Sequence, residues 1–304
     1  MSIIHPADSR RPRVMSTGVR RSGTLGLAGL LLLPTLVLYA ALLVGPFLIL
    51  LIESLRPYEG GRVGGLSTGW TIENYANFLH FQYFRIFRDT IPLSFIASAI
   101  GIALAYPLAH RIARTRSRGF RRFWINVLVA TLFLDTLIRC YSLVLFFGPA
   151  GVVSPILQYL FDIAGNNITL LRTQVVFGLL YFAIPISVLT LVGPIENISP
   201  RLSEAAQTLG ASYWKSGLAI DFRISLPAVL SSFLLTFTHS IAAFATPMIL
   251  GKGFVLFIAN VIYERFSESA DFPGGAALSI IVLVFTLAIV YAFTRLIQLI
   301  WRLA

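Results

Sequence analysis

The sequence predicts an all-α integral membrane protein with one transmembrane domain that crosses the bilayer six times. Of its 304 residues, 57% are hydrophobic and only 12% are charged, which is too little charge for a soluble domain of this length. The apolar residues gather in runs of about 20 or more, the length that a helix needs to cross a hydrocarbon core roughly 30 Å thick. Polar residues separate these runs, so we expect membrane-spanning helices in contact with lipid, joined by loops.

The N-terminal part predicts a tail followed by the first span. Residues 1–24 are polar and arginine-rich and lack the apolar core of a signal peptide, so we expect a cytoplasmic tail. The first apolar run, residues 25–52, is long enough to tilt in the bilayer or to bend at Pro34 and Pro46. Residues 25–304 are predicted to form one transmembrane domain, of which this run is the first span.

The rest of the chain alternates loops with apolar runs. A glycine-rich stretch opens the loop at 56–89, and the segment TIENYANFLHFQYF at 71–84 predicts an amphipathic helix at the membrane surface. Residues 148–173 are expected to form an outer loop with a partial helix, and 251–275 an interfacial or re-entrant segment. Both either contact an external partner or serve only as connections. The five further spans are predicted at residues 91–109, 123–147, 175–195, 228–250 and 276–300.

Basic residues predict the orientation. Most of the 24 lysines and arginines lie near the two ends of the chain and in two loops, residues 110–123 and 196–227. The alternate loops hold fewer of them and also hold acidic residues such as Glu73 and Asp162. Since cytoplasmic loops are enriched in lysine and arginine, both termini and these two loops are predicted to be cytoplasmic. The net charge of +11 does not indicate nucleic acid, because the basic residues are not gathered in one polar domain.

No catalytic or metal site is expected. The chain lacks the G-x-x-x-x-G-K-[ST] phosphate loop, so it should not hydrolyse ATP itself. Its four histidines have no metal-binding spacing, and the single cysteine, Cys140, cannot form an internal disulfide. The composition therefore indicates transport or anchoring, with no cofactor bound by this chain.

One stretch between two apolar runs, residues 198–227, has the composition of a soluble interaction surface. Ser199 and Pro200 predict a helix start, because the hydroxyl can cap free amides and proline needs no N–H in the first turn. Gly210 predicts the end of this helix, and Ser212 is expected to cap a second short one. The first helix has a narrow apolar stripe at i, i+3, i+4 and i+7, formed by Leu202, Ala205, Ala206 and Leu209.

This stretch resembles the EAA loop of membrane subunits of binding-protein-dependent ABC importers. The resemblance rests on Glu204-Ala205-Ala206, on Gly210-Ala211-Ser212 three residues later, and on Ser225-Leu226-Pro227. It implies a coupling helix that docks into a groove on the ATP-hydrolysing subunit. The implied coupling residues are Leu202, Glu204, Ala205, Ala206, Leu209, Gly210, Ala211 and Ser212.

Two other stretches are similar to spermidine/putrescine importer permeases: LDTLIRCYSLVLFFGPAGVVSPIL from Leu134 and DFPGGAALSIIVLVFTLAIVY from Asp271. The resemblance implies the type I ABC importer architecture, an inner-membrane location and a small, cationic, polyamine-like solute. It also implies a second permease subunit, a homodimer of ATP-binding subunits that holds ATP and Mg²⁺, and an external solute-binding protein. Two positions depart from the pattern: Gly217 replaces the usual phenylalanine, and Phe222-Arg223 the usual Leu-Pro.

Ionisable groups inside the predicted spans are candidates for the transport path, since charge at membrane depth is costly. Asp135 and Arg139 lie four residues apart on one helix face, so either they neutralise each other or Asp135 meets a cationic solute. His239 is expected to make an interhelical hydrogen bond in preference to relaying protons. The predicted path residues are Asp135, Arg139, Tyr141, Tyr181, Ser240 and Phe244.

Other interpretations remain open. Pro185 and Pro247 are expected to kink their spans and free carbonyl groups toward a cavity. A secondary transporter driven by an ion gradient through Asp135 and His239, or a structural membrane anchor, would also fit six spans. The importer could instead carry another small solute, such as an amino-acid derivative, an opine or a phosphonate. Dependence on a separate ATPase distinguishes the importer from the ion-driven transporter.

Overall fold

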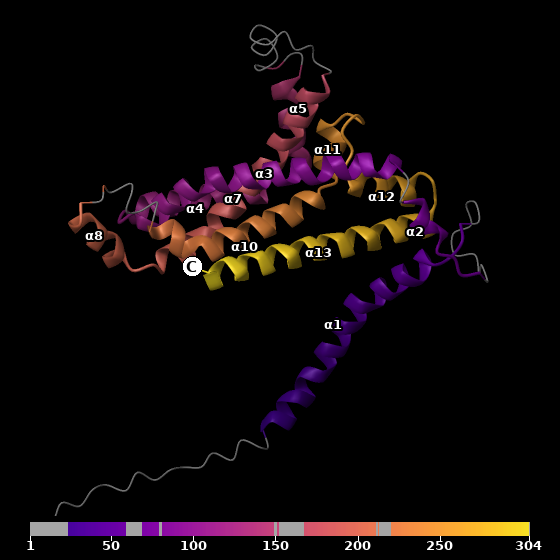
Figure 1. Ribbon diagram of the computed structural model, residues 1–304, viewed down its shortest axis with the longest axis horizontal. Helices are drawn as coiled ribbons and strands as arrows, with labels where there is room; N and C mark the ends of the chain where they lie inside the picture. Colours follow the sequence, from indigo (N-terminus) through magenta and orange to yellow (C-terminus); the bar gives the residue numbers. More distant parts are fainter. Residues whose placement is uncertain are drawn as a thin grey trace, which may run out of the picture. The chain divides into compact units, whose positions relative to one another are not determined.

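The computed structural model describes residues 24–58, 69–78, 81–148, 151, 167–210, 212 and 220–303, and every regular element within these ranges is helical (Figure 1). The chain divides into two compact units, residues 1–49 and 50–304. In the first unit α1 begins at Thr24 and runs without interruption to Ser54 in the second. The predicted first span is thus confirmed to within two residues. Of the predicted tail, residues 1–24, only Thr24 is described, and it is the first residue of α1.

The predicted number of spans is confirmed if one bent helix pair is counted as a span. Among the described residues, five helices are long and apolar enough to cross a membrane, and the pair α4 and α5 would make the sixth. The five are α1, α3 (Phe81–Arg114), α7 (Ile168–Glu196), α10 (Phe222–Ile241) and α13 (Phe272–Leu303).

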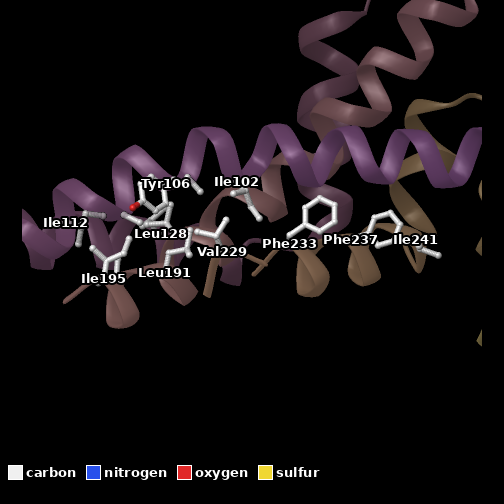
Figure 2. Close-up of a cluster of buried hydrophobic side chains, with 14 residues drawn as sticks. Ile102, Tyr106, Ile112, Leu128, Leu191, Ile195, Val229, Phe233, Phe237 and Ile241 are labelled. Atoms are coloured by element: carbon white, nitrogen blue, oxygen red, sulfur yellow. The ribbon is translucent and has the colours of Figure 1, made fainter. Parts of the chain in front are cut away.

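The second unit is built around α3 and α7, which pack against each other, with α10 against both (Figure 1). Small residues permit the close approach of α3 and α7: a Cβ atom on Gly101 would lie 3.0 Å from the Cβ of Ala183. Figure 2 shows the core cluster beneath α3, where Tyr106, Leu191 and Phe233 come from the three helices. Apolar burial thus ties together helices that are far apart in the sequence.

The prediction of one amphipathic helix over residues 71–84 is wrong. The structure has a five-residue helix, α2 (Glu73–Asn77), and α3 already begins at Phe81. The amide of Asn74 is buried and donates to the carbonyl oxygens of Ser54 and Arg56, at 2.9 and 2.7 Å. These bonds satisfy carbonyls at the end of α1, so tertiary hydrogen bonding overrides the helical pattern of this segment.

The basic loop predicted at 110–123 is mostly helical. α3 continues to Arg114 and α4 (Arg118–Phe133) begins after a three-residue turn. Ser117 caps α4, and its hydroxyl accepts a hydrogen bond from the N–H of Phe120 at 3.4 Å. Arginines have long aliphatic stems, so they can extend a helix past the apolar run that precedes them.

The span predicted at 123–147 is broken into two helices. α4 ends at Phe133, α5 (Thr136–Phe147) begins after two residues, and the two helices are bent by 95°. Asp135 is the N-cap of α5, and its Oδ2 accepts from the N–H of Leu137 at 2.8 Å. An aspartate that bonds its own neighbouring backbone favours a helix start, so it begins a new helix within the apolar run.

The fifth predicted span, 228–250, is also interrupted. α10 covers only 222–241, and α11 (Ala245–Leu250) follows as a separate short helix. Pro247 lacks an N–H and would clash with the carbonyl of Ala243 in a continuous helix. The expected kink is therefore a complete break. The amide of Asn260 donates to the carbonyl of Phe244 at 2.9 Å, which satisfies one group at this break.

The two remaining segments are partly ordered as helices. Within 251–275, α12 (Ile258–Ser267) packs against α13 and buries Ile258 and Val261, so the segment folds onto the protein. Within 148–173, α7 begins at Ile168 after an N-cap at Asn167, whose side chain accepts from the N–H of Thr169 at 3.0 Å. Residues 149–150 and 152–166 lie outside the described part, so a partial helix there is untested.

Candidate coupling helix and transport pocket

The predicted interaction helix is α8 (Pro200–Thr208), with proline at the first turn as expected. The hydroxyl of Ser199 makes no capping hydrogen bond, so that part of the prediction is wrong. Gly210 follows the helix with φ +90°, a left-handed conformation that glycine adopts without a Cβ penalty. Gly210 thus ends the helix as predicted. Ala211 and 213–219 lie outside the described residues, so capping of a second helix by Ser212 is untested.

The apolar stripe of α8 faces outward. Leu202 is 48% exposed and Leu209 is 89% exposed. Glu204 and Ala205 are also exposed, and Ala206 is half-buried. A nine-residue helix that exposes Leu202 beside its alanines and is followed by the exposed Leu209 has a surface suited to a protein partner.

A buried ionic cluster, which the sequence analysis missed, holds the two ends of the segment that carries α8. The guanidinium of Arg114 donates from Nε and Nη2 to Oδ2 of Asp221, at 3.0 and 2.8 Å, and from Nη1 to the carbonyl of Ile198 at 2.9 Å. Nε2 of His110 lies 3.0 Å from the same Oδ2 atom. The one available signal was the spacing of His110 and Arg114, which places both on one face of α3.

A second ion pair lies nearby on the surface. Arg121 of α4 donates from both terminal nitrogens to the carboxylate of Glu196 of α7, at 2.7 and 2.6 Å. Both side chains are about two-fifths exposed, so solvent screens this pair more than the buried cluster.

A cavity of about 370 Å³ lies at the break between α4 and α5, and residues of α7, α10 and α11 also line it. Its polar lining includes two of the predicted path residues, Asp135 and Arg139. Other residues in its wall are Cys140, Gly178, Phe182, His239 and Thr246. The cavity therefore forms at the two helix breaks that the apolar pattern did not predict.

Asp135 and Arg139 have different partners within the described part of the chain. Arg139 is 7% exposed and donates from Nη2 to the carbonyl oxygens of Thr131 and Leu132, at 2.7 and 2.9 Å. Its positive charge thus lies at the C-terminal end of α4, where free carbonyls favour a cation. Asp135 accepts from the backbone of α5 and keeps further acceptor sites on its carboxylate, since an ionised carboxylate has about four lone-pair positions.

The other predicted path residues occupy different environments. The guanidinium of Arg139 lies 5.5 Å from the ring centroid of Tyr181, but Tyr181 itself is not among the residues that line the cavity. Tyr141 is 61% exposed, Ser240 is buried, and the Phe244 ring packs 4.7 Å from that of Tyr263. These last three path residues do not line this cavity.

His239 lines the cavity, where its ring makes an aromatic contact. Its ring stacks on Phe182 of α7, with centroids 3.6 Å apart and planes 19° apart. The interhelical hydrogen bond predicted for His239 is therefore not found among the described residues, where stacking on Phe182 supplies the contact between α10 and α7.

The family model described as "Binding-protein-dependent transport system inner membrane component" matches residues 125–302. The spermidine/putrescine transport system permease protein PotB of Salmonella typhimurium strain LT2 is 30% identical over 77% of this chain and 79% of that protein. Its counterpart from Haemophilus influenzae is 29% identical over 74% of this chain and 79% of its own length.

A solved structure has a similar fold. It is the crystal structure of a bacterial alginate ABC transporter in complex with alginate pentasaccharide-bound periplasmic protein. The matched chain covers 90% of this chain and 95% of its own length, with a TM-score of 0.71 and 20% identity. At this identity the match concerns the fold alone, which is that of a type I ABC importer permease.

Proposed function

The chain belongs to the family of binding-protein-dependent transport system inner membrane components, so it is a permease subunit of an ABC importer and not an enzyme, and we propose that its solute is a small polyamine-like cation. The observation that carries the importer role is the family match over 125–302, which includes α8. The proposal of a polyamine-like solute rests on the relatives named spermidine/putrescine permeases, which are 29 to 30% identical over about three quarters of the chain. Asp135 in the cavity wall supports a cationic solute.

The proposed assembly has four kinds of chain. This permease would pair with a second permease subunit, and both would bind a homodimer of ATP-binding subunits that holds ATP and Mg²⁺. An external solute-binding protein would deliver the solute. The family description, which names dependence on a binding protein, supports the last of these partners.

Coupling is proposed to run through α8. ATP binding would draw the two ATP-binding subunits together, and α8 would move with the subunit on which it docks. The outward stripe of Leu202, Ala205, Ala206 and Leu209 would supply the contact, with Glu204, Gly210, Ala211 and Ser212 around it. Movement of α8 would change the relative stability of inward-facing and outward-facing states, which is alternating access.

The solute is proposed to pass through the cavity at the helix breaks. Asp135 would bind an ammonium group by a charge-assisted hydrogen bond, which is roughly twice as strong as a neutral one. The carbonyls of Thr131 and Leu132 bind the guanidinium of Arg139 and would offset part of its positive charge toward the solute. The cavity volume of about 370 Å³ lies in the range of small-molecule sites, roughly 300 to 1,000 Å³.

Both termini and α8 are proposed to face the cytoplasm. The turn between α3 and α4 and the helix ends around it carry Arg114, Arg116, Arg118, Arg121 and Arg122, as expected for a cytoplasmic side. α8 lies between α7 and α10, and it would have to face the cytoplasm in order to reach an ATP-binding subunit.

The experiment that tests the proposal is purification of the tagged chain from its native membrane in mild detergent, followed by reconstitution into proteoliposomes. We expect an ATP-binding chain with a phosphate loop and a second six-span chain to co-purify. With the binding protein added outside and ATP inside, the vesicles should take up radiolabelled spermidine. If the chain is recovered without partners, and uptake depends on an ion gradient and not on ATP, the result would favour the secondary transporter.

A further inference from the structure

The ends of three helices meet at one buried carboxylate. Arg114 is the last residue of α3, Asp221 immediately precedes α10, and Ile198 lies between α7 and α8. Oδ2 of Asp221 receives two hydrogen bonds from Arg114, and Nη1 of the same guanidinium binds the carbonyl of Ile198. One side chain of α3 therefore holds both ends of the segment that contains α8.

This arrangement links parts of the chain that are far apart in sequence. Arg114 is 84 residues from Ile198 and 107 residues from Asp221. α3 has no direct chain connection to the α8 segment, whereas α7 leads into it and α10 leads out of it (Figure 1). Arg114 thus adds α3 to the two helices that already continue from this segment.

Burial of the cluster strengthens the interaction between Arg114 and Asp221. The Asp221 side chain is 1% exposed, and those of Arg114 and His110 are 14% and 12% exposed. Water screens such a pair little, and removing one partner leaves a buried charge unsatisfied. The dipole of α3 also favours the positive charge of Arg114, which is the last residue of that helix.

We infer that Arg114 is a positioning residue for transport. Its hydrogen bonds to Asp221 and Ile198, which we call the clasp, attach both ends of the α8 segment to α3, so that movement of α8 is transmitted to α3 together with α7 and α10. This inference rests on the proposed coupling role of α8. α3 in turn packs closely against α7, with Gly101 beside Ala183. A displacement of Asp221 and Ile198 is therefore transmitted through Arg114 to α3 and α7, which move together. The guanidinium suits this position because its planar fork binds two acceptors at once.

Two conservative substitutions distinguish the loss of these hydrogen bonds from a general loss of folding. Arg114→Lys keeps the positive charge, but a single ammonium on a flexible stem does not reproduce the fork that bridges Asp221 and Ile198. Asp221→Asn keeps the shape of the side chain and removes its charge. Arg121→Lys is the matched control, because it makes the same exchange in the exposed pair with Glu196.

The first measurement uses the full-length chain in lipid nanodiscs, with the native Cys140 replaced by serine. Spin labels at Arg201 on α8 and at Arg116 beyond α3 report the distance between the two elements. We expect one narrow distance distribution in this background and in Arg121→Lys. In Arg114→Lys and Asp221→Asn a second distance should gain about tenfold in population, the effect of losing roughly one charge-assisted hydrogen bond.

Identical narrow distributions in all four chains would overturn the inference. Loss of folded protein in both clasp variants would also overturn it, because the cluster would then serve folding and not coupling. Size-exclusion chromatography of each variant decides this point.

The second measurement uses the purified complex in proteoliposomes and compares spermidine uptake with ATP hydrolysed. We expect Arg114→Lys to retain the ATP-binding chain and to lower uptake per ATP by about tenfold, while Arg121→Lys leaves the ratio unchanged. An unchanged ratio in Arg114→Lys would exclude the positioning role. If the unsubstituted complex carries no spermidine, the proposed solute fails, and the distance measurement still decides whether the clasp exists.

Discussion

Gly178 of α7 lies so close to Thr246 of α11 that a Cβ atom on the glycine would come within 2.5 Å of the threonine methyl group. The same Cβ would lie 2.6 Å from a methyl group of Leu250. The absence of a side chain at Gly178 therefore lets α11 pack on α7 beside the cavity. For Gly193, on the same helix, no atom of the described residues lies within 4 Å of the equivalent position once its chain neighbours and the nearby helix backbone are set aside.

Substitution of these two glycines by alanine is expected to have different effects on the stability of the protein. Gly178→Ala should destabilise the protein by about 1 to 3 kcal/mol, because the new methyl group forces α11 to move. Gly193→Ala should be neutral or stabilise it by up to about 1 kcal/mol, since alanine is the better helix former. Thermal unfolding of both variants in the same detergent measures the difference. Equal stability of the two would show that α11 does not depend on this contact.

Asp135→Asn isolates the charge of Asp135 from its capping role. Asparagine is also a good N-cap, so α5 should begin at the same residue. We expect spermidine uptake to need about tenfold or more solute, because a neutral amide loses the charge-assisted bond to an ammonium group. The measurement is the concentration dependence of uptake in proteoliposomes.

Asp135→Ala is the companion variant, since it removes both the charge and the cap. It should lose uptake and also stability, by about 1 kcal/mol for the missing cap. Wild-type uptake by Asp135→Asn would remove Asp135 from the proposed solute path.

Arg139→Gln tests the attachment of α5 to the C-terminal end of α4. The substitution removes the cation from the carbonyls of Thr131 and Leu132, and we expect a loss of about 1 to 3 kcal/mol in stability. Arg295→Gln is the control, because Arg295 is exposed on α13 and should change stability by no more than about 0.5 kcal/mol. Thermal unfolding checks both. A stable Arg139→Gln would mean that the break at Asp135 holds without this residue.

Ala206→Glu tests docking of α8. A carboxylate on the apolar stripe would be buried against the ATP-binding subunit without a partner, so the variant should lose that subunit during purification. Gln207→Glu introduces the same charge one residue later, about 100° around the helix from Ala206. We expect Gln207→Glu to retain the ATP-binding subunit. Normal co-purification and transport by Ala206→Glu would rule out the coupling role of this stripe.

Local chemistry explains which predictions succeeded. Pro200 and Gly210 marked the start and the end of α8 because each acts on its own backbone: one lacks an N–H, and the other adopts φ +90° without strain. The spans could be predicted because the hydrocarbon thickness sets the length of an apolar helix whatever its neighbours are. The break at Asp135 was missed, and only a kink was expected at Pro247, because the apolar runs continue through Asp135 and up to Pro247 and both residues were interpreted as parts of longer helices.

The sequence by itself thus determined the class of the protein, its apolar helices and the helix that is proposed to couple it to ATP hydrolysis. Only the tertiary structure decided that Arg139 binds the carbonyls of α4 instead of Asp135, and that Arg114 joins Ile198 to Asp221. The reason is physical. Hydropathy and capping depend on neighbours along the chain, whereas a buried charge takes its partner from whichever helix packing brings within hydrogen-bond distance.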